Sequence, residues 1–184
     1  IYELLGGQVH KKLRSYTYLY PKKSDKIDVY TNAELAAERA NEYIEKGFTA
    51  VKFDPVGPYT SLDPRGLSLN DLVKVESFVE TIHKSVKNKC DLLIGTHGQM
   101  TTASAIRLAK RLEKFDPMWF EEPVPPENFD EMGKVSSSTT IPIATGERLA
   151  TKYEFSKILH SRGASILQMN LGRVGGILEA KKIA

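Results

Sequence analysis

Hydrophobic and polar residues along this chain follow two alternating patterns. Short apolar runs, typical of buried strands, are each followed by a segment in which apolar residues recur every three or four positions, as in an amphipathic helix. The expected strands are 13–20, 49–53, 92–94, 118–120, 141–144 and 165–169. The expected helices are 33–46, 72–86, 102–112, 129–135, 152–160 and one that begins near residue 176. The pattern therefore predicts six strand–helix units.

Local signals define the first helix and the loop that follows the second strand. Thr31 and Glu34 have the spacing of a capping box, and Gly47 is expected to end the helix. The loop at 54–66 is rich in proline and glycine and is long for a connection between a strand and a helix. We expect it to lie on the same face of the fold as the chemistry.

Regular alternation of strands and helices predicts an α/β fold with a parallel sheet and helices outside it. A doubly wound dinucleotide fold would need a glycine-rich turn after its first strand, and residues 20–28 contain no glycine. The other parallel architecture is the TIM-type (β/α)8 barrel, which typically needs about 250 residues. We therefore expect residues 1–184 to be the central part of a (β/α)8 barrel catalytic domain, six of its units. The first residue is Ile1 rather than Met, so we expect a piece of a longer protein.

Composition excludes several classes of protein. The chain has 26 Lys and Arg against 23 Asp and Glu, a net charge of +3, and its lysines are scattered, so nucleic acid is not an expected partner. No apolar run approaches the 18 residues or so of a membrane span. Cys90 is the one cysteine, which rules out an internal disulfide and favours a reducing, cytoplasmic location.

Polar residues gather where the expected strands end, which is where TIM barrels carry their chemistry. They are Lys52 and Asp54 after the second strand, His97 after the third, Glu121 after the fourth, Glu147 and Arg148 after the fifth, and Gln168 and Asn170 after the sixth. Glu121 and Glu147 are one strand–helix unit apart, so they are expected to face one cavity. Two such carboxylates repel each other unless a cation lies between them, and oxygen ligands favour Mg²⁺.

Three segments carry a family resemblance. Trp-Phe-Glu-Glu-Pro at 119–123, Ile-Ala-Thr-Gly-Glu-Arg at 143–148, and Ile-Leu-Gln at 166–168 followed by the glycine pair at 175–176 resemble the enolase superfamily. The resemblance covers nearly the whole chain and is to the mandelate racemase/muconate lactonizing enzyme subgroup. Within that subgroup the chain looks most like the acid-sugar dehydratases, such as galactonate dehydratase.

The resemblance implies a hydro-lyase that converts an aldonate or aldarate into a 2-keto-3-deoxy acid, by removing the α-proton and forming an enediolate. It implies Mg²⁺ held by acids that end strands three, four and five, with Glu121 and Glu147 at the last two positions. It also implies a small sugar acid as the substrate and a homo-oligomer.

Further roles follow from the same resemblance. His97 would protonate the leaving hydroxyl, and Lys52 would offer a positive charge to the substrate carboxylate. The loop at 54–66 would line the polyol end of the substrate. Asp54, Arg148 and Gln168 are candidate substrate-binding residues, and Arg148 is alternatively an ion-pair partner that orients Glu147.

Three positions depart from the family pattern. Gly95 stands where the family has its first metal ligand, an Asp. Lys52-Phe53-Asp54 stands where racemases of the subgroup have Lys-x-Lys. The family has a catalytic His–Asp pair, and its His belongs to a seventh strand. Asn170 stands at the position of the Asp and is therefore the candidate catalytic residue there. The seventh strand and the family's N-terminal capping domain are not among these 184 residues.

Two alternatives stay open beside the dehydratase. One is a racemase or cycloisomerase of the same superfamily, which the missing second lysine disfavours. The other is a catalytically degenerate barrel that binds a sugar acid without converting it, which Gly95 and Asn170 favour.

Overall fold

The computed structural model describes residues 1–57 and 66–184. Six strands form one parallel sheet in the order of the sequence. They are β1 Thr17–Tyr18, β2 Ala50–Phe53, β3 Asp91–Gly95, β4 Trp119–Glu121, β5 Ile143–Thr145 and β6 Ile166–Leu167. The predicted α/β class with a parallel sheet is confirmed. Most of the expected loop at 54–66, with its predicted substrate-lining role, lies outside the described residues.

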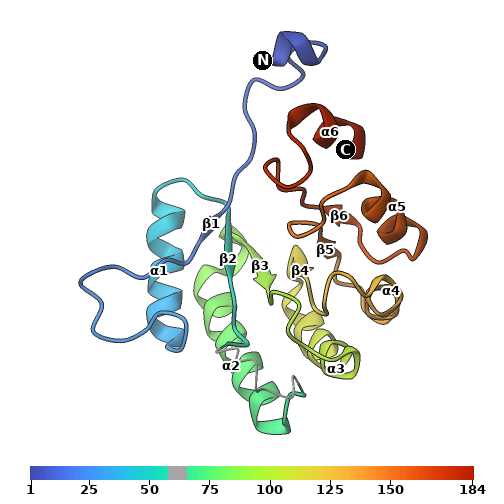
Figure 1. Ribbon diagram of the computed structural model, residues 1–184. Coiled ribbons are helices and arrows are strands. Elements are labelled where there is room, and N and C mark those ends of the chain that lie inside the picture. Colours follow the sequence, from blue (N-terminus) through green and yellow to red (C-terminus); the bar gives the residue numbers. More distant parts are fainter. Residues whose placement is uncertain (58–65) are drawn as a thin grey trace.

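Helices connect successive strands and surround the sheet on its outer side (Figure 1). They are α1 Ala33–Glu45, α2 Leu69–Val86, α3 Thr102–Leu112, α4 Phe129–Ser137, α5 Lys152–His160 and α6 Ile177–Ile183, with the short 3-10 helices η1 Tyr2–Leu5, η2 Lys87–Lys89 and η3 Glu113–Phe115. Each of α1 to α5 contacts the next helix along the chain. In the described ranges, no helix has the length and apolar character needed to cross a membrane.

The start of α1 differs from the predicted capping box. Asn32, not Thr31, is the N-cap, and its side chain accepts a hydrogen bond from the backbone N–H of Leu35 at 2.8 Å. Thr31 instead closes the preceding turn, where its backbone N–H donates to the carbonyl of Asp28 at 3.2 Å. The predicted stop is confirmed, because Gly47 has φ +94° and donates to the carbonyl of Ile44.

The two outer strands are shorter than predicted. β1 and β6 contain two residues each, where 13–20 and 165–169 were expected. Among the described strands, β1 pairs only with β2 and β6 only with β5. The flanking backbone therefore has a neighbouring strand on one side at most, and Leu13 is 81% exposed.

Side chains alternate between the two faces of the sheet and divide the core into two parts. Most buried apolar residues lie between the sheet and the helices, and Val51, Ile94 and Phe120 belong to this large cluster. A small cluster lies on the inner face and contains Ala50, Leu93, Trp119 and Ala144. Because strand side chains repeat every two positions, the residues two places further along β2, β3 and β4 share this inner face. These are Lys52, Gly95 and Glu121.

Candidate active site

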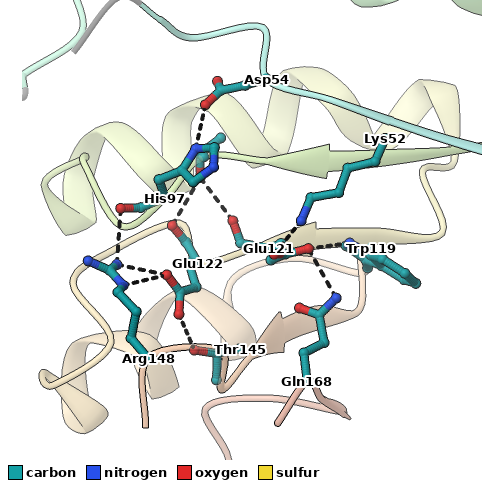
Figure 2. Close-up of polar contacts among 10 residues, drawn as sticks. Lys52, Asp54, His97, Trp119, Glu121, Glu122, Thr145, Arg148 and Gln168 are labelled. Atoms are coloured by element: carbon teal, nitrogen blue, oxygen red, sulfur yellow. Dashed lines mark hydrogen bonds and ion pairs between the residues drawn. The ribbon is translucent and has the colours of Figure 1, made fainter. Parts of the chain in front are cut away.

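Lys52 and Glu121 meet on the inner face, at the carboxyl end of the sheet (Figure 2). Strand register places Gly95 of β3 opposite Glu121 of β4, and Lys52 comes from β2, the neighbour of β3 on its other side. The Lys52 Nζ lies 2.5 Å from Glu121 Oε1, and the two side chains are only 10% and 5% exposed. Two buried opposite charges are therefore paired with each other at the centre of the predicted site.

The second oxygen of Glu121 is also occupied. Trp119 Nε1 donates to Glu121 Oε2 at 3.0 Å, and Gln168 Nε2 donates to the same atom at 3.1 Å. Trp119 was not predicted as a site residue, although its position two residues before Glu121 in a strand places both side chains on one face. The carboxylate is thus held rigidly by three donors from β2, β4 and the segment after β6.

His97 and Asp54 form a second pair at the same edge of the sheet (Figure 2). His97 Nδ1 lies 2.8 Å from Asp54 Oδ2, and the other oxygen, Asp54 Oδ1, accepts a hydrogen bond from the backbone N–H of Val56 at 3.0 Å. The hydrogen bond that His97 makes to the Asp54 carboxylate raises the pKa of His97 above its usual 6.5, and burial acts against it. The imidazole is half exposed, so it can exchange a proton with a ligand.

Arg148 binds Glu122, so the prediction that it orients Glu147 is wrong. Arg148 Nη2 and Nε lie 2.7 and 3.0 Å from Glu122 Oε2, and Thr145 Oγ1 lies 3.4 Å from Glu122 Oε1. The same Nη2 donates to the backbone carbonyl of His97 at 3.0 Å. Burial raises the pKa of Glu122, while the Arg148 guanidinium lowers it. Arg148 therefore ties the turn that carries His97 to the strand end that carries Glu122.

Thr96 and Gly98 join the end of β3 to the end of β4. The buried Thr96 hydroxyl lies 3.1 and 3.0 Å from the backbone carbonyls of Glu121 and Glu122, and the Gly98 N–H donates to the Glu122 carbonyl. His97 and Gly98 both have positive φ, of 53° and 66°. Thr96 was not predicted as a site residue, and the one signal for it in the sequence was its place between Gly95 and His97.

Replacing Gly98 with alanine is expected to lower the free energy of unfolding by about 2 kcal/mol. The alanine would take a positive φ, and its Cβ would lie 3.0 Å from the Val124 carbonyl oxygen and 3.2 Å from Pro125 Cα. Urea unfolding of the two proteins measures the difference. Gly66→Ala is the matched control, since no described atom lies within 4 Å of its added Cβ. Equal stability of the wild type and Gly98→Ala would contradict this account.

A cavity of about 530 Å³ opens beside the His97–Asp54 pair. Its walls include the aromatic rings of Tyr18, Tyr20 and Tyr30. Burial, followed by the nearby Asp54 carboxylate, raises the pKa of Tyr18, so this hydroxyl stays protonated and can donate a hydrogen bond. The volume suits a small organic molecule.

Three predicted site residues remain, Gln168, Asn170 and Glu147. Gln168 Oε1 is buried and accepts no hydrogen bond from the described residues. Asn170 is exposed, and its Oδ1 accepts a hydrogen bond from the backbone N–H of Gly172 in its own turn. Glu147 is partly buried, and its charge contributes to raising the pKa of His97. Their predicted roles stay predictions.

The donor set of this site does not fit a three-carboxylate metal centre. Gly95 has no side chain to supply the first ligand, and a Cβ added there would lie 2.6 Å from Cε of Lys52, whose flexible end would have to move to admit one. Glu121 is already paired with that lysine. Within residues 1–57 and 66–184, no group of three or more His, Cys, Asp or Glu side chains is placed to hold a metal ion.

The chain is similar to proteins named as sugar-acid dehydratases and to solved structures of mandelate racemase/muconate lactonizing enzyme-like proteins. It is 34% identical to D-xylonate dehydratase of Haloferax volcanii and 35% identical to D-gluconate/D-galactonate dehydratase of Picrophilus torridus, matching 100% of this chain and 44% of each relative. A crystal structure of a mandelate racemase/muconate lactonizing enzyme from Sulfitobacter sp. is 48% identical with a TM-score of 0.95, over 100% of this chain and 46% of that one. A mandelate racemase/muconate lactonizing enzyme candidate from Labrenzia alexandrii is 60% identical with a TM-score of 0.93, over 99% of this chain and 46% of that one.

These matches confirm the resemblance to the enolase superfamily and to its acid-sugar dehydratases. The chain spans about half the length of the relatives that it matches. A family model covers most of the chain, from residue 35 to residue 184. The chain therefore belongs to the Enolase C-terminal domain-like family.

Proposed function

We propose that this chain forms part of the active site of a sugar-acid dehydratase, and that its residues are the central six units of an eight-unit barrel. The observation that carries the proposal is the His97–Asp54 pair, which lies at the carboxyl end of the sheet beside Lys52 and Glu121. The relatives from H. volcanii and P. torridus are named as dehydratases of sugar acids, which supports the reaction class. An aldonate or aldarate is the proposed substrate class.

In this proposal His97 is the general acid. Dehydration breaks the bond between the β-carbon and its hydroxyl, and the departing oxygen leaves as water if it receives a proton. Asp54 accepts from Nδ1, which holds the imidazole in one orientation and favours its protonated form. Nε2 is then the atom that donates to the leaving hydroxyl.

Other residues bind and orient the substrate. The Lys52 ammonium has donors beyond the one that meets Glu121, and these attract the substrate carboxylate. The unsatisfied Gln168 Oε1 accepts a hydrogen bond from a substrate hydroxyl. Arg148 acts on the reaction through the turn of His97, whose carbonyl it binds. The group that removes the α-proton is not assigned to any of these residues.

Enolase-superfamily sites generally use Mg²⁺, which stabilises the enediolate in reactions of this class. The family resemblance predicts Glu121 and Glu147 as its ligands. Because the donor set does not fit, no step of this proposal is assigned to a metal ion.

A sugar-acid-binding barrel without catalysis is the second candidate function. Two observations favour it: Gly95 cannot supply a ligand side chain, and Asn170 is hydrogen-bonded within its own turn. A racemase is disfavoured because position 54, where the racemases have their second lysine, is an aspartate in this chain. That aspartate is hydrogen-bonded to His97.

A panel of aldonates and aldarates tests the proposal. The full-length polypeptide is incubated with each acid in D₂O, and ¹H NMR follows both loss of the α-proton and formation of a 2-keto-3-deoxy acid. We expect at least one acid to give the keto acid, and its 3-deoxy analogue, which has no β-hydroxyl to lose, to give none. Inversion at C2 without loss of water would replace the dehydratase with a racemase. Binding without any turnover across the panel would favour the second candidate.

A further inference from the structure

Gly95 leaves a space that a lysine fills. It ends β3 and lies in register with Glu121, so any side chain at 95 would lie beside that carboxylate. The ideal Cβ position is 2.6 Å from Lys52 Cε and 3.6 Å from Lys52 Nζ. A side chain at position 95 would therefore require the flexible end of Lys52 to move, and the glycine leaves that end in place to reach Glu121.

Lys52 is bound in this space by contacts that a surface lysine would not have. Its side chain is 10% exposed, its Nζ lies 2.5 Å from Glu121 Oε1, and the same Nζ lies 6.0 Å from the centroid of the Tyr16 ring. Removing either partner of a buried ion pair leaves the other charge without compensation, which is strongly unfavourable. A divalent ion at Glu121 would have to displace the lysine and leave its largely buried ammonium without this partner.

Most carboxylates of the site are already paired with a basic side chain. Three carboxylates at the strand ends each have a basic side chain within 2.8 Å. The pairs are Glu121 with Lys52, Asp54 with His97, and Glu122 with Arg148. With His97 protonated these three pairs are neutral and Glu147 is the remaining carboxylate of the site, so a cation between Glu121 and Glu147 would face one unpaired acid rather than two.

We propose that Lys52 is the resident cation of this site, in the position on Glu121 where a divalent metal ion would bind, and that Gly95 is the residue that permits it. The proposal deepens the proposed function, on which its substrate rests: the sugar acid binds to a site charged by an ammonium group, with no divalent ion. It assigns Gly95 and Lys52 as a matched pair that decides which cation the site uses.

Titration with Mg²⁺ alone tests the cation directly. Isothermal titration calorimetry of the wild-type polypeptide is expected to show no saturable binding through the millimolar range. Gly95→Asp combined with Lys52→Ala restores the third carboxylate and removes the competing ammonium, and we expect it to gain about tenfold or more in Mg²⁺ affinity. Gly95→Asn with Lys52→Ala is the matched control, since asparagine has the same shape without the charge. It should gain less.

Two results would overturn the proposal. One is saturable Mg²⁺ binding by the wild type that Glu121→Gln abolishes. The other is a folded Gly95→Asp/Lys52→Ala variant that binds Mg²⁺ no better than the wild type. If that variant does not fold, the melting temperature of the wild type in EDTA and in Mg²⁺ decides, because a resident lysine predicts the same value in both and a metal site predicts a rise with Mg²⁺.

The failure of this inference is distinguishable from failure of the proposed function. Dehydration that proceeds in EDTA supports both. Dehydration that requires Mg²⁺ overturns the resident-lysine proposal and keeps the dehydratase. If no acid is dehydrated in either condition, the dehydratase proposal fails, and the calorimetry still decides which cation Glu121 holds.

Discussion

Replacing His97 with asparagine is expected to lower kcat for sugar-acid dehydration by about 10²- to 10⁴-fold, the usual contribution of a positioned general acid. The imidazole is the proton donor of the proposed mechanism, and asparagine has no proton to give at neutral pH. Asparagine is the least disruptive replacement, because position 97 has φ +53° and asparagine tolerates the left-handed region better than most residues. Steady-state kinetics on an acid identified by the panel measures the change.

The control is the same substitution elsewhere on the molecule. His160 lies at the end of α5, where its Nδ1 lies 2.7 Å from the carbonyl oxygen of Ser156, so His160→Asn should leave kcat unchanged. KM should change little in His97→Asn if the side chain acts mainly in the transition state. A kcat equal to that of the wild type would show that His97 is not the general acid.

The pH profile gives a second test of the same residue. A general acid must be protonated, so the rate falls as pH rises through the pKa of His97, which lies above 6.5 because of Asp54. Asp54→Asn removes the carboxylate that favours the charged imidazole, and the pKa of His97 falls. We therefore expect the alkaline limb of kcat/KM to move to lower pH in Asp54→Asn. A limb that does not move would show that another group titrates.

Replacing Arg148 with methionine is expected to lower the free energy of unfolding by about 3 kcal/mol at neutral pH. Glu122 is 1% exposed, and both of its hydrogen bonds from a charged group come from Arg148. Without the guanidinium, the carboxylate stays buried and, among the described residues, keeps the Thr145 hydroxyl as its side-chain hydrogen-bond partner. Urea unfolding measures the loss, and Arg173→Met, at an exposed position, is the control for the substitution itself.

The loss in Arg148→Met should also depend on pH. Burial raises the pKa of Glu122 in the folded protein above its usual 4.5, and Arg148 opposes this shift, so removing Arg148 raises the pKa further. A raised pKa stabilises the fold while the carboxyl is protonated, fully below 4.5, and this stability is lost as pH rises through the folded value. The loss is larger in the variant, whose pKa is shifted further. The variant should therefore be closest to the wild type in acid and furthest from it at neutral pH.

A double variant separates the buried charge from the lost packing of Arg148. Arg148→Met combined with Glu122→Gln has no charge to bury, so it should recover part of the stability at neutral pH. Equal losses in the single and double variants would mean that Glu122 is not the source of the effect.

Much of the fold could be read from local patterns. Strand and helix periods depend on neighbours a few residues away, and all six units were located, with inner strands displaced by one or two residues at most. Signals that depend on a single residue were less reliable. The spacing of Thr31 and Glu34 suggested a capping box, but the carbonyl of Asp28 closes a turn at Thr31 and leaves Asn32 to cap α1.

The α/β architecture and the set of side chains at the carboxyl ends of the strands can be predicted from local sequence patterns, because both follow from the order of residues along one strand or helix. Which of those side chains are partners depends on the folded structure. Lys52 and Glu121 are 69 residues apart, Asp54 and His97 43, and Glu122 and Arg148 26, so each pair depends on strand register and on rotamers that no local pattern specifies. The space beside Gly95 is the clearest case, because the proposed role of this glycine depends on where the Lys52 side chain lies, which the sequence does not specify.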